Sequence, residues 1–171
     1  MAQGHLDIAI LPEALDPAAA RGPELFRDEL VVVVWPGHRF TAMPYVTAKD
    51  FDSQTYLTYS LASRPGFESE GLWSREDAMP LRKQNLGSVD AVCELIGAKV
   101  GVSVLSRWGV HREIATGMLA AVQAGAAGLP IAWRALVSDN QPKDAPARRV
   151  AADLEERFAQ PPTVEGGNPA S

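Results

Sequence analysis

The clearest pattern of hydrophobic and polar positions lies between residues 86 and 108. Apolar side chains recur there at the i, i+3, i+4 and i+7 spacing of a helix that covers a sheet, namely at Val89, Val92, Cys93 and Ile96. Ser88 precedes them and can cap the first turn. The apolar run at residues 100–105 then predicts a buried strand. Together these residues predict a βαβ-type step whose free N–H groups, at residues 87–90, open where α/β sheets hold ligands.

Shorter patterns predict the remaining elements. Residues 30–35 are apolar without polar alternation, which suits a strand at the centre of a sheet, covered on both faces. Other strands are predicted at residues 6–11, 54–59, 81–86, 118–122 and 129–137. Helices are predicted at residues 47–51 with Thr47 as the cap, at 67–78, after Trp108 and from Asp144 onward. The last helix is expected to bury a face made of Ala147, Val150, Ala151, Leu154 and Phe158.

Two flexible crossings divide this succession of strands and helices into an α/β fold of two lobes. They lie near residues 52–54 and 124–128, where turn residues and small side chains gather. We therefore expect residues 54–124 to form one lobe, and residues 1–53 together with 125–160 to form the other. Residues 161–171 are rich in proline, glycine and small polar side chains, so we expect a disordered tail there.

The composition is that of a globular protein without nucleic-acid or membrane character. Of the 171 residues, 46% are hydrophobic and 22% are charged, and the net charge is −5. No basic stripe is available to neutralise a duplex, and no apolar stretch approaches the roughly 20 residues of a membrane span. The N-terminal residues show no export signal and Cys93 is the only cysteine, so we expect a cytoplasmic protein.

Catalytic and metal-binding patterns are weak in this sequence. There is no G-x-S-x-G motif, and the histidines His5, His38 and His111 fall in unrelated contexts. The cysteine and the histidines also lack the spacing that places metal ligands on one face. We therefore expect no catalytic residue, metal ion or cofactor, and we expect His38 and His111 to be solvated. The tryptophans are expected in the core, except Trp108, which could form a cleft wall.

Small hydroxyl residues and helix starts are the remaining candidates for binding. They follow two predicted strands: Thr58, Ser60 and Ser63 the first, and Gly87, Ser88 and Val89 the second. Such groups can bind an anionic or polar ligand. The alternative is that Ser60 and Ser88 only cap the helices that follow them, and Ser88 can have both roles.

Four segments, at residues 4–10, 30–38, 88–96 and 101–108, read GHLDIAI, LVVVVWPGH, SVDAVCELI and GVSVLSRW. In this order and spacing they resemble the effector-binding domain of LysR-type transcriptional regulators. Within that family, the segments LSRW and WRA, which end at Trp108 and Ala135, are most similar to the methionine-biosynthesis regulator subgroup. The resemblance implies a two-lobed, periplasmic-binding-protein-like fold of type II, with a small-molecule effector in the cleft between the lobes.

The resemblance also implies which residues line the cleft. They come from the loop after a first-lobe strand, the start of the second lobe and a helix N-terminus: Leu11, Pro12, Glu13, Thr58, Ser60, Leu61, Ala62, Ser63, Gly87, Ser88, Val89 and Asp90. The implied effector is a small polar metabolite, such as an amino acid or a thiol metabolite. The helix at residues 88–98 is expected to contact a partner subunit in a homodimer or tetramer of the full-length protein.

The sequence also departs from the family pattern. Neither the winged helix-turn-helix nor the first strand and helix of the effector domain precedes Gly4, so we expect a truncated domain that reaches DNA only through the missing part. Lys99 stands where the family usually has glycine, and a left-handed Lys99 would cost on the order of 1 kcal/mol. A stand-alone solute-binding protein of the same fold is the main alternative, although it would need an export signal. An α/β enzyme stands last because no nucleophile–base pair is evident.

Overall fold

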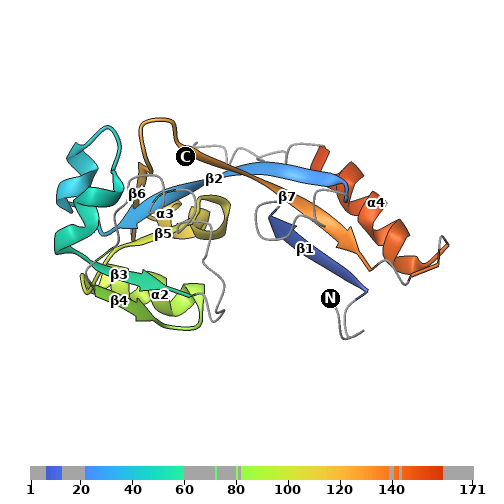
Figure 1. The fold of residues 1–171 in the computed structure, drawn as a ribbon, viewed down its shortest axis with the longest axis horizontal. Helices are drawn as coiled ribbons and strands as arrows, with labels where there is room; N and C mark the ends of the chain where they lie inside the picture. The colour runs from blue at the N-terminus through green and yellow to red at the C-terminus, as the bar shows by residue number, and fades with distance from the viewer. Residues whose placement is uncertain are drawn as a thin grey trace, which may run out of the picture. The chain divides into compact units, whose positions relative to one another are not determined.

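The computed structural model describes residues 7–12, 22–59, 72, 80, 82–138, 141–142 and 144–159 (Figure 1). Its strands are β1 (Ile8–Pro12), β2 (Glu24–Val34), β3 (Thr55–Thr58), β4 (Arg82–Asn85), β5 (Ser103–Ser106), β6 (Ala120–Gln123) and β7 (Leu129–Val137). Its α-helices are α2 (Val89–Gly97), α3 (His111–Ala115) and α4 (Pro146–Ala159), and its 3-10 helices are η3 (Arg39–Ala42), η4 (Ala48–Ser53) and η6 (Trp108–Val110). The predicted helix at residues 67–78, apart from Leu72, and the predicted tail at 161–171 lie outside the described residues.

The chain divides into two compact units. Unit 1 comprises Met1–Arg27 with Ala132–Ser171, and unit 2 comprises Asp28–Ile131. The boundaries therefore fall within β2 and β7, not at the turn-rich residues 52–54 and 124–128. Those residues lie inside unit 2, where Gly125 N–H donates to the Val46 carbonyl at 2.8 Å.

The centre of unit 2 is β2, whose side chains from Leu30 to Val34 are all buried. Because successive side chains of a strand point to opposite faces, they enter two hydrophobic clusters. Leu30, Val32 and Val34 join one cluster, and Val31 and Val33 join the other. The same strand pairs antiparallel with both β5 and β6. The prediction of a central strand covered on both faces is confirmed.

The predicted βαβ step is also present in unit 2. β3 and β4 pair in parallel, and α2 then connects β4 to β5. Val102 forms a parallel bridge with Tyr56 of β3, so β3 lies between the two strands that the step connects. Ser103 Oγ donates a hydrogen bond of 2.7 Å to the Leu57 carbonyl at this junction. α2 buries Val92, Cys93 and Ile96 against Leu57 and its neighbours, as its apolar spacing predicts.

The C-terminus of α2 has the backbone geometry that was considered from the sequence. Lys99 N–H donates to the Ile96 carbonyl and Val100 N–H donates to the Leu95 carbonyl, both at 2.9 Å. This pair of bonds at a helix end requires a left-handed backbone at the residue just after the last helical turn. That residue is Lys99, and its φ is 63°. A lysine there is strained by on the order of 1 kcal/mol relative to glycine.

Unit 1 has a smaller core. β1 pairs antiparallel with β7, from Ile8 opposite Val137 to Pro12 opposite Trp133. Leu25, Ala135 and Ala151 form its buried cluster, against which Leu154 of α4 packs. Phe26 stacks on Trp133 and Phe158, with ring centroids 6.0 Å and 5.0 Å apart.

The predicted buried face of α4 is wrong at Val150, which is 45% exposed. Ala147 and Ala151 are buried, and Leu154 and Phe158 are partly buried. These four residues form a narrow stripe at helical spacing, and Val150 lies at the edge of that stripe.

The expected surface position of His38 is also wrong. Its side chain is only 5% exposed because its ring packs edge-on against Trp35 and Phe40. Trp35 is half-buried and packs against the cluster that contains Val32, Trp133 is half-buried and stacks on Phe26, and Trp73 lies outside the described residues. His111 is exposed as expected, and Trp108, the predicted exception, is 53% exposed.

Candidate functional site

The N-terminus of α2 follows directly on the carboxyl end of β4. Ser88 is extended and its Oγ accepts a hydrogen bond of 3.2 Å from Ala91 N–H, so its predicted role as a helix cap is confirmed. Gly87 has a φ of 76°, which a glycine adopts without strain. Gly87 N–H, expected to be free, donates to Asn85 Oδ1 at 3.1 Å. The helix start is therefore preorganised, and its first polar side chain, Asp90, is exposed.

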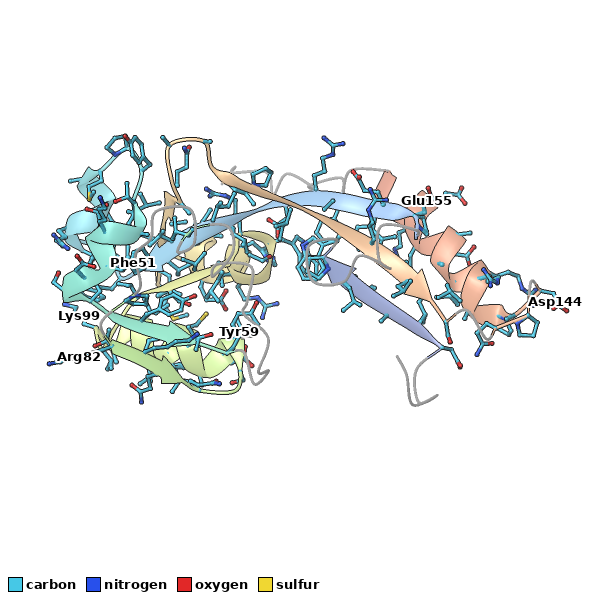
Figure 2. The ribbon with its side chains drawn as sticks, in the orientation of Figure 1. Phe51, Tyr59, Arg82, Lys99, Asp144 and Glu155 are labelled. Atoms are coloured by element: carbon cyan, nitrogen blue, oxygen red, sulfur yellow. The ribbon has the colours of Figure 1, made fainter. Side chains whose placement is uncertain are left out.

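Thr58 belongs to the same edge of the unit 2 sheet. It ends β3, is 1% exposed, and its carbonyl accepts a hydrogen bond of 2.8 Å from Leu86 N–H. Since β3 and β4 are parallel, their carboxyl ends meet at one edge. Figure 2 shows this polarity, with Tyr59 at one end of the strand pair and Arg82 and Lys99 at the other. The structure thus places Thr58 and residues 87–90 at one edge of the sheet.

Two further predicted site residues belong to unit 1. Leu11 and Pro12 end β1 in unit 1, where they lie opposite Arg134 and Trp133 of β7. Leu11 is half-buried and Pro12 is buried. The remaining predicted residues lie outside the described part of the chain: Glu13, Ser60, Leu61, Ala62 and Ser63.

A polar network at the carboxyl end of β5 was missed from the sequence. Ser106 Oγ donates to the Asp28 carboxylate, which also accepts from Trp108 N–H at 3.2 Å. Ser106 Oγ in turn accepts from Gly109 N–H at 3.0 Å. Asp28 and Ser106 are 78 residues apart, so no local pattern marks the pair. Because β5 runs parallel to β3, this network lies at the same edge as Thr58 and Ser88.

The network holds an exposed aromatic pair. The Trp108 ring, which is 53% exposed, stacks on the His111 ring with centroids 6.5 Å apart and planes inclined by 22°. His111 Nδ1 lies 2.7 Å from the Trp108 carbonyl, so it donates a hydrogen bond to it. This edge of the unit 2 sheet therefore offers hydroxyl groups, backbone N–H groups and one fixed aromatic surface.

Nucleophilic and metal chemistry find little support in this unit. Burial raises the pKa of the Cys93 thiol to about 11, and the nearby carboxylates of Glu113, Asp90 and Glu94 add to the shift. The thiol is therefore protonated, and a poor nucleophile, at neutral pH. Within the described residues, no group of three His, Cys, Asp or Glu side chains could hold a metal ion. In that same part of the chain, no helix has the length and apolar character needed to cross a membrane.

A model of the LysR substrate binding domain family matches residues 1–159. The chain belongs to this family. LysR substrate binding domains are regulatory, effector-binding domains and not a family of enzymes. None of the curated proteins compared with the chain matches its sequence.

Solved LysR regulatory domains share the fold of this LysR domain. The regulatory domain of MetR from N. meningitidis is 19% identical, with a TM-score of 0.66 over 93% of this chain and 67% of that chain. The CcmR regulatory domain of Synechocystis, in complex with 2-PG, is 16% identical, with a TM-score of 0.67 over 91% and 69%. The effector-binding domain of QuiR, in complex with shikimate, is 18% identical, with a TM-score of 0.58 over 91% and 67%. The predicted periplasmic-binding-protein-like α/β fold of type II is confirmed.

Proposed function

We propose that this LysR domain senses a small polar metabolite and thereby controls transcription. The observation that supports this proposal is the edge of the unit 2 sheet, where the capped N-terminus of α2 lies beside the buried end of β3. A helix N-terminus favours a negatively charged or polar group, because its first N–H groups and its dipole point outward. Ser88, which is exposed, adds a hydroxyl group to this edge.

The relatives support a small polar effector. QuiR and CcmR were solved with shikimate and 2-PG, respectively, so domains of this fold hold small molecules. We extend this to the present chain by analogy of fold, with an amino acid or a thiol metabolite as the predicted class. Leu11, Pro12 and Glu13 stay predicted contacts of the same effector. The methionine-biosynthesis subgroup, a cytoplasmic location, a homodimer or tetramer, and DNA binding through a further domain are parts of the same proposal.

The effector proposal can be tested through Ser88. We would titrate the chain with L-cysteine, L-methionine and other amino acids and thiols, and measure the shift of the thermal midpoint. Ser88→Ala should lower stability by about 1 kcal/mol without ligand, because the cap is lost. If the hydroxyl also contacts the effector, this variant should lose about 1 kcal/mol more of the ligand-induced stabilisation.

Ser88→Asn is the matched control, because asparagine caps helices as well as serine does. It should restore stability without restoring ligand binding. Equal ligand-induced stabilisation of Ser88→Ala and the parent chain would leave Ser88 with the capping role alone. If none of the compounds stabilised the parent chain, the predicted effector class would be contradicted.

A stand-alone solute-binding protein of the same fold is the alternative function. The coding DNA upstream of the Met1 codon distinguishes the two. An in-frame helix-turn-helix supports the regulator, since DNA recognition needs such an element. An export signal in that place would overturn the regulator and support the solute-binding protein.

A further inference from the structure

The ring of His38 is buried in unit 2 and both of its nitrogens face a hydrogen-bonding partner. The side chain is 5% exposed. Phe40 N–H lies 3.2 Å from Nδ1, and Gln54 Oε1 lies 3.3 Å from Nε2. Since the first partner is a donor, Nδ1 must accept and carry no proton. The proton is therefore on Nε2, which donates to Gln54, and the ring is neutral.

The surroundings of the ring are aromatic. The ring lies edge-on to Trp35, at 4.3 Å between centroids, and to Phe40, at 4.5 Å. Arg39, on η3, is the nearby charged group. Its guanidinium lies over the Phe40 ring and donates to the Asp50 carbonyl at 2.9 Å. On η4, the Asp50 carboxylate accepts from the backbone and hydroxyl of Thr47, while Lys49 and Asp52 are exposed.

These contacts close a segment between β2 and β3, residues 36–54, which we call the clasp. The bond between His38 and Gln54 joins its two ends. Its middle is held at Val46, whose N–H donates to the Gln123 carbonyl at 2.9 Å. The clasp places Phe40 and Phe51, both fully buried, in the hydrophobic cluster on one face of β2. Release of the His38 end would therefore expose part of this core while the Val46 contact remains.

We propose that the clasp is a proton-sensitive switch, closed by neutral His38 and opened when a proton on Nδ1 brings two donors face to face. A protonated Nδ1 repels Phe40 N–H and removes the cap from the first turn of η3. The cation would also be buried against aromatic rings, which costs far more than the same charge in water. Opening of the clasp relieves both effects and exposes Trp35 to solvent.

The direction of the pH dependence follows from these contacts. Burial lowers the pKa of His38, the hydrogen bond to Gln54 raises it and Arg39 lowers it further, with a net decrease from the ordinary value of 6.5. In the open state the ring is solvated and its pKa is the ordinary one. The closed state is therefore fully favoured above about pH 6.5, and it loses stability as the pH falls below that value.

The test follows the parent chain from pH 8 to pH 4 by tryptophan emission and by NMR titration of the histidine ring carbons. We expect the His38 ring to titrate below the ordinary pKa, together with a red shift of Trp35 emission. Trp35→Phe should remove the emission change. His38→Asn keeps an acceptor for Phe40 N–H but does not titrate, so it should lose the acidic transition. His111→Asn, at the exposed histidine, should retain it.

Three results would overturn the proposal. The first is an acidic transition of the same midpoint and amplitude in His38→Asn. The second is a His38 ring that titrates at the ordinary pKa. The third is titration of His38 without any change in Trp35 emission. The last two are measured on the parent chain, so the test stands even if His38→Asn does not fold.

Discussion

β2 has two different environments along its length. Its C-terminal part in unit 2, Leu30–Val34, is buried on both faces and feeds two hydrophobic clusters. Its N-terminal part in unit 1, Glu24–Arg27, has one buried side chain, that of Leu25. In β1 of unit 1, Ile10 is 45% exposed, and Pro12 is the one buried residue of the strand. One strand thus takes part in a two-sided core and in a shallow, largely one-sided one.

The comparison indicates that the two units are stabilised by different interactions. Burial on both faces doubles the apolar area that a strand removes from water, and this area is the main source of folding free energy. Among the described residues of unit 1, the core cluster contains Leu25, Ala135 and Ala151, and two of these side chains are single methyl groups. Polar and aromatic contacts must therefore contribute a larger share there.

The largest expected effect is in the core of unit 2. Ile96→Ala on α2 should lower the free energy of unfolding by about 3 kcal/mol, because a fully buried side chain is removed from a well-packed cluster. Val150→Ala on α4 is the matched change at an exposed apolar residue and should alter it by less than about 0.5 kcal/mol. Urea unfolding measures both. Comparable losses of unfolding free energy in the two variants would mean that the buried side chain on α2 stabilises the chain no more than the exposed one on α4, contrary to the comparison.

A second variant tests the close approach of strands inside unit 2. A Cβ at Gly101 would lie 2.4 Å from the Thr55 carbonyl oxygen, so Gly101→Ala must push β3 away from Val102. We expect a loss of about 2–3 kcal/mol by overpacking. Gly97→Ala, where nothing lies within 4 Å, should instead stabilise α2 by about 0.5–1 kcal/mol. A Gly101→Ala variant as stable as the parent would show that the strand junction is loose.

The smallest expected effect is in unit 1. Arg134 is 20% exposed and donates to the Gly22 carbonyl at 3.0 Å and to Glu24 at 3.3 Å. Arg134→Ala should cost about 1 kcal/mol, because it leaves a half-buried carbonyl without its donor. Arg27→Ala removes an exposed partner of the same Glu24 and should leave stability unchanged. Thermal unfolding of the two variants decides whether polar contacts stabilise this unit.

The sequence predicted those features that depend on neighbouring residues. The cap at Ser88 and the buried stripe of α2 both follow from residues within a few positions of each other. The apolar run that became the buried part of β2 needed no partner to be recognised as a central strand. Thr58 and Ser88 were expected in one cleft because of the family resemblance, and not because of a local pattern.

Features that depend on distant pairing could not be predicted. The bond between Ser106 and Asp28 requires the register of β2 and β5, which turn signals and periodicity do not specify. His38 was expected at the surface because it follows a Pro-Gly turn. Its ring is instead hydrogen-bonded to the side chain of Gln54, sixteen positions later.

The burial of Cys93 makes its thiol a probe of local unfolding in unit 2. Only the thiolate reacts with a disulfide reagent, and with a pKa of about 11 roughly one thiol in a thousand is ionised at pH 8. Its side chain is also 5% exposed, so the folded chain should react very slowly. Because the chain has no other cysteine, the labelling rate of the Cys93 thiol measures how often α2 separates from the core of unit 2 by local unfolding.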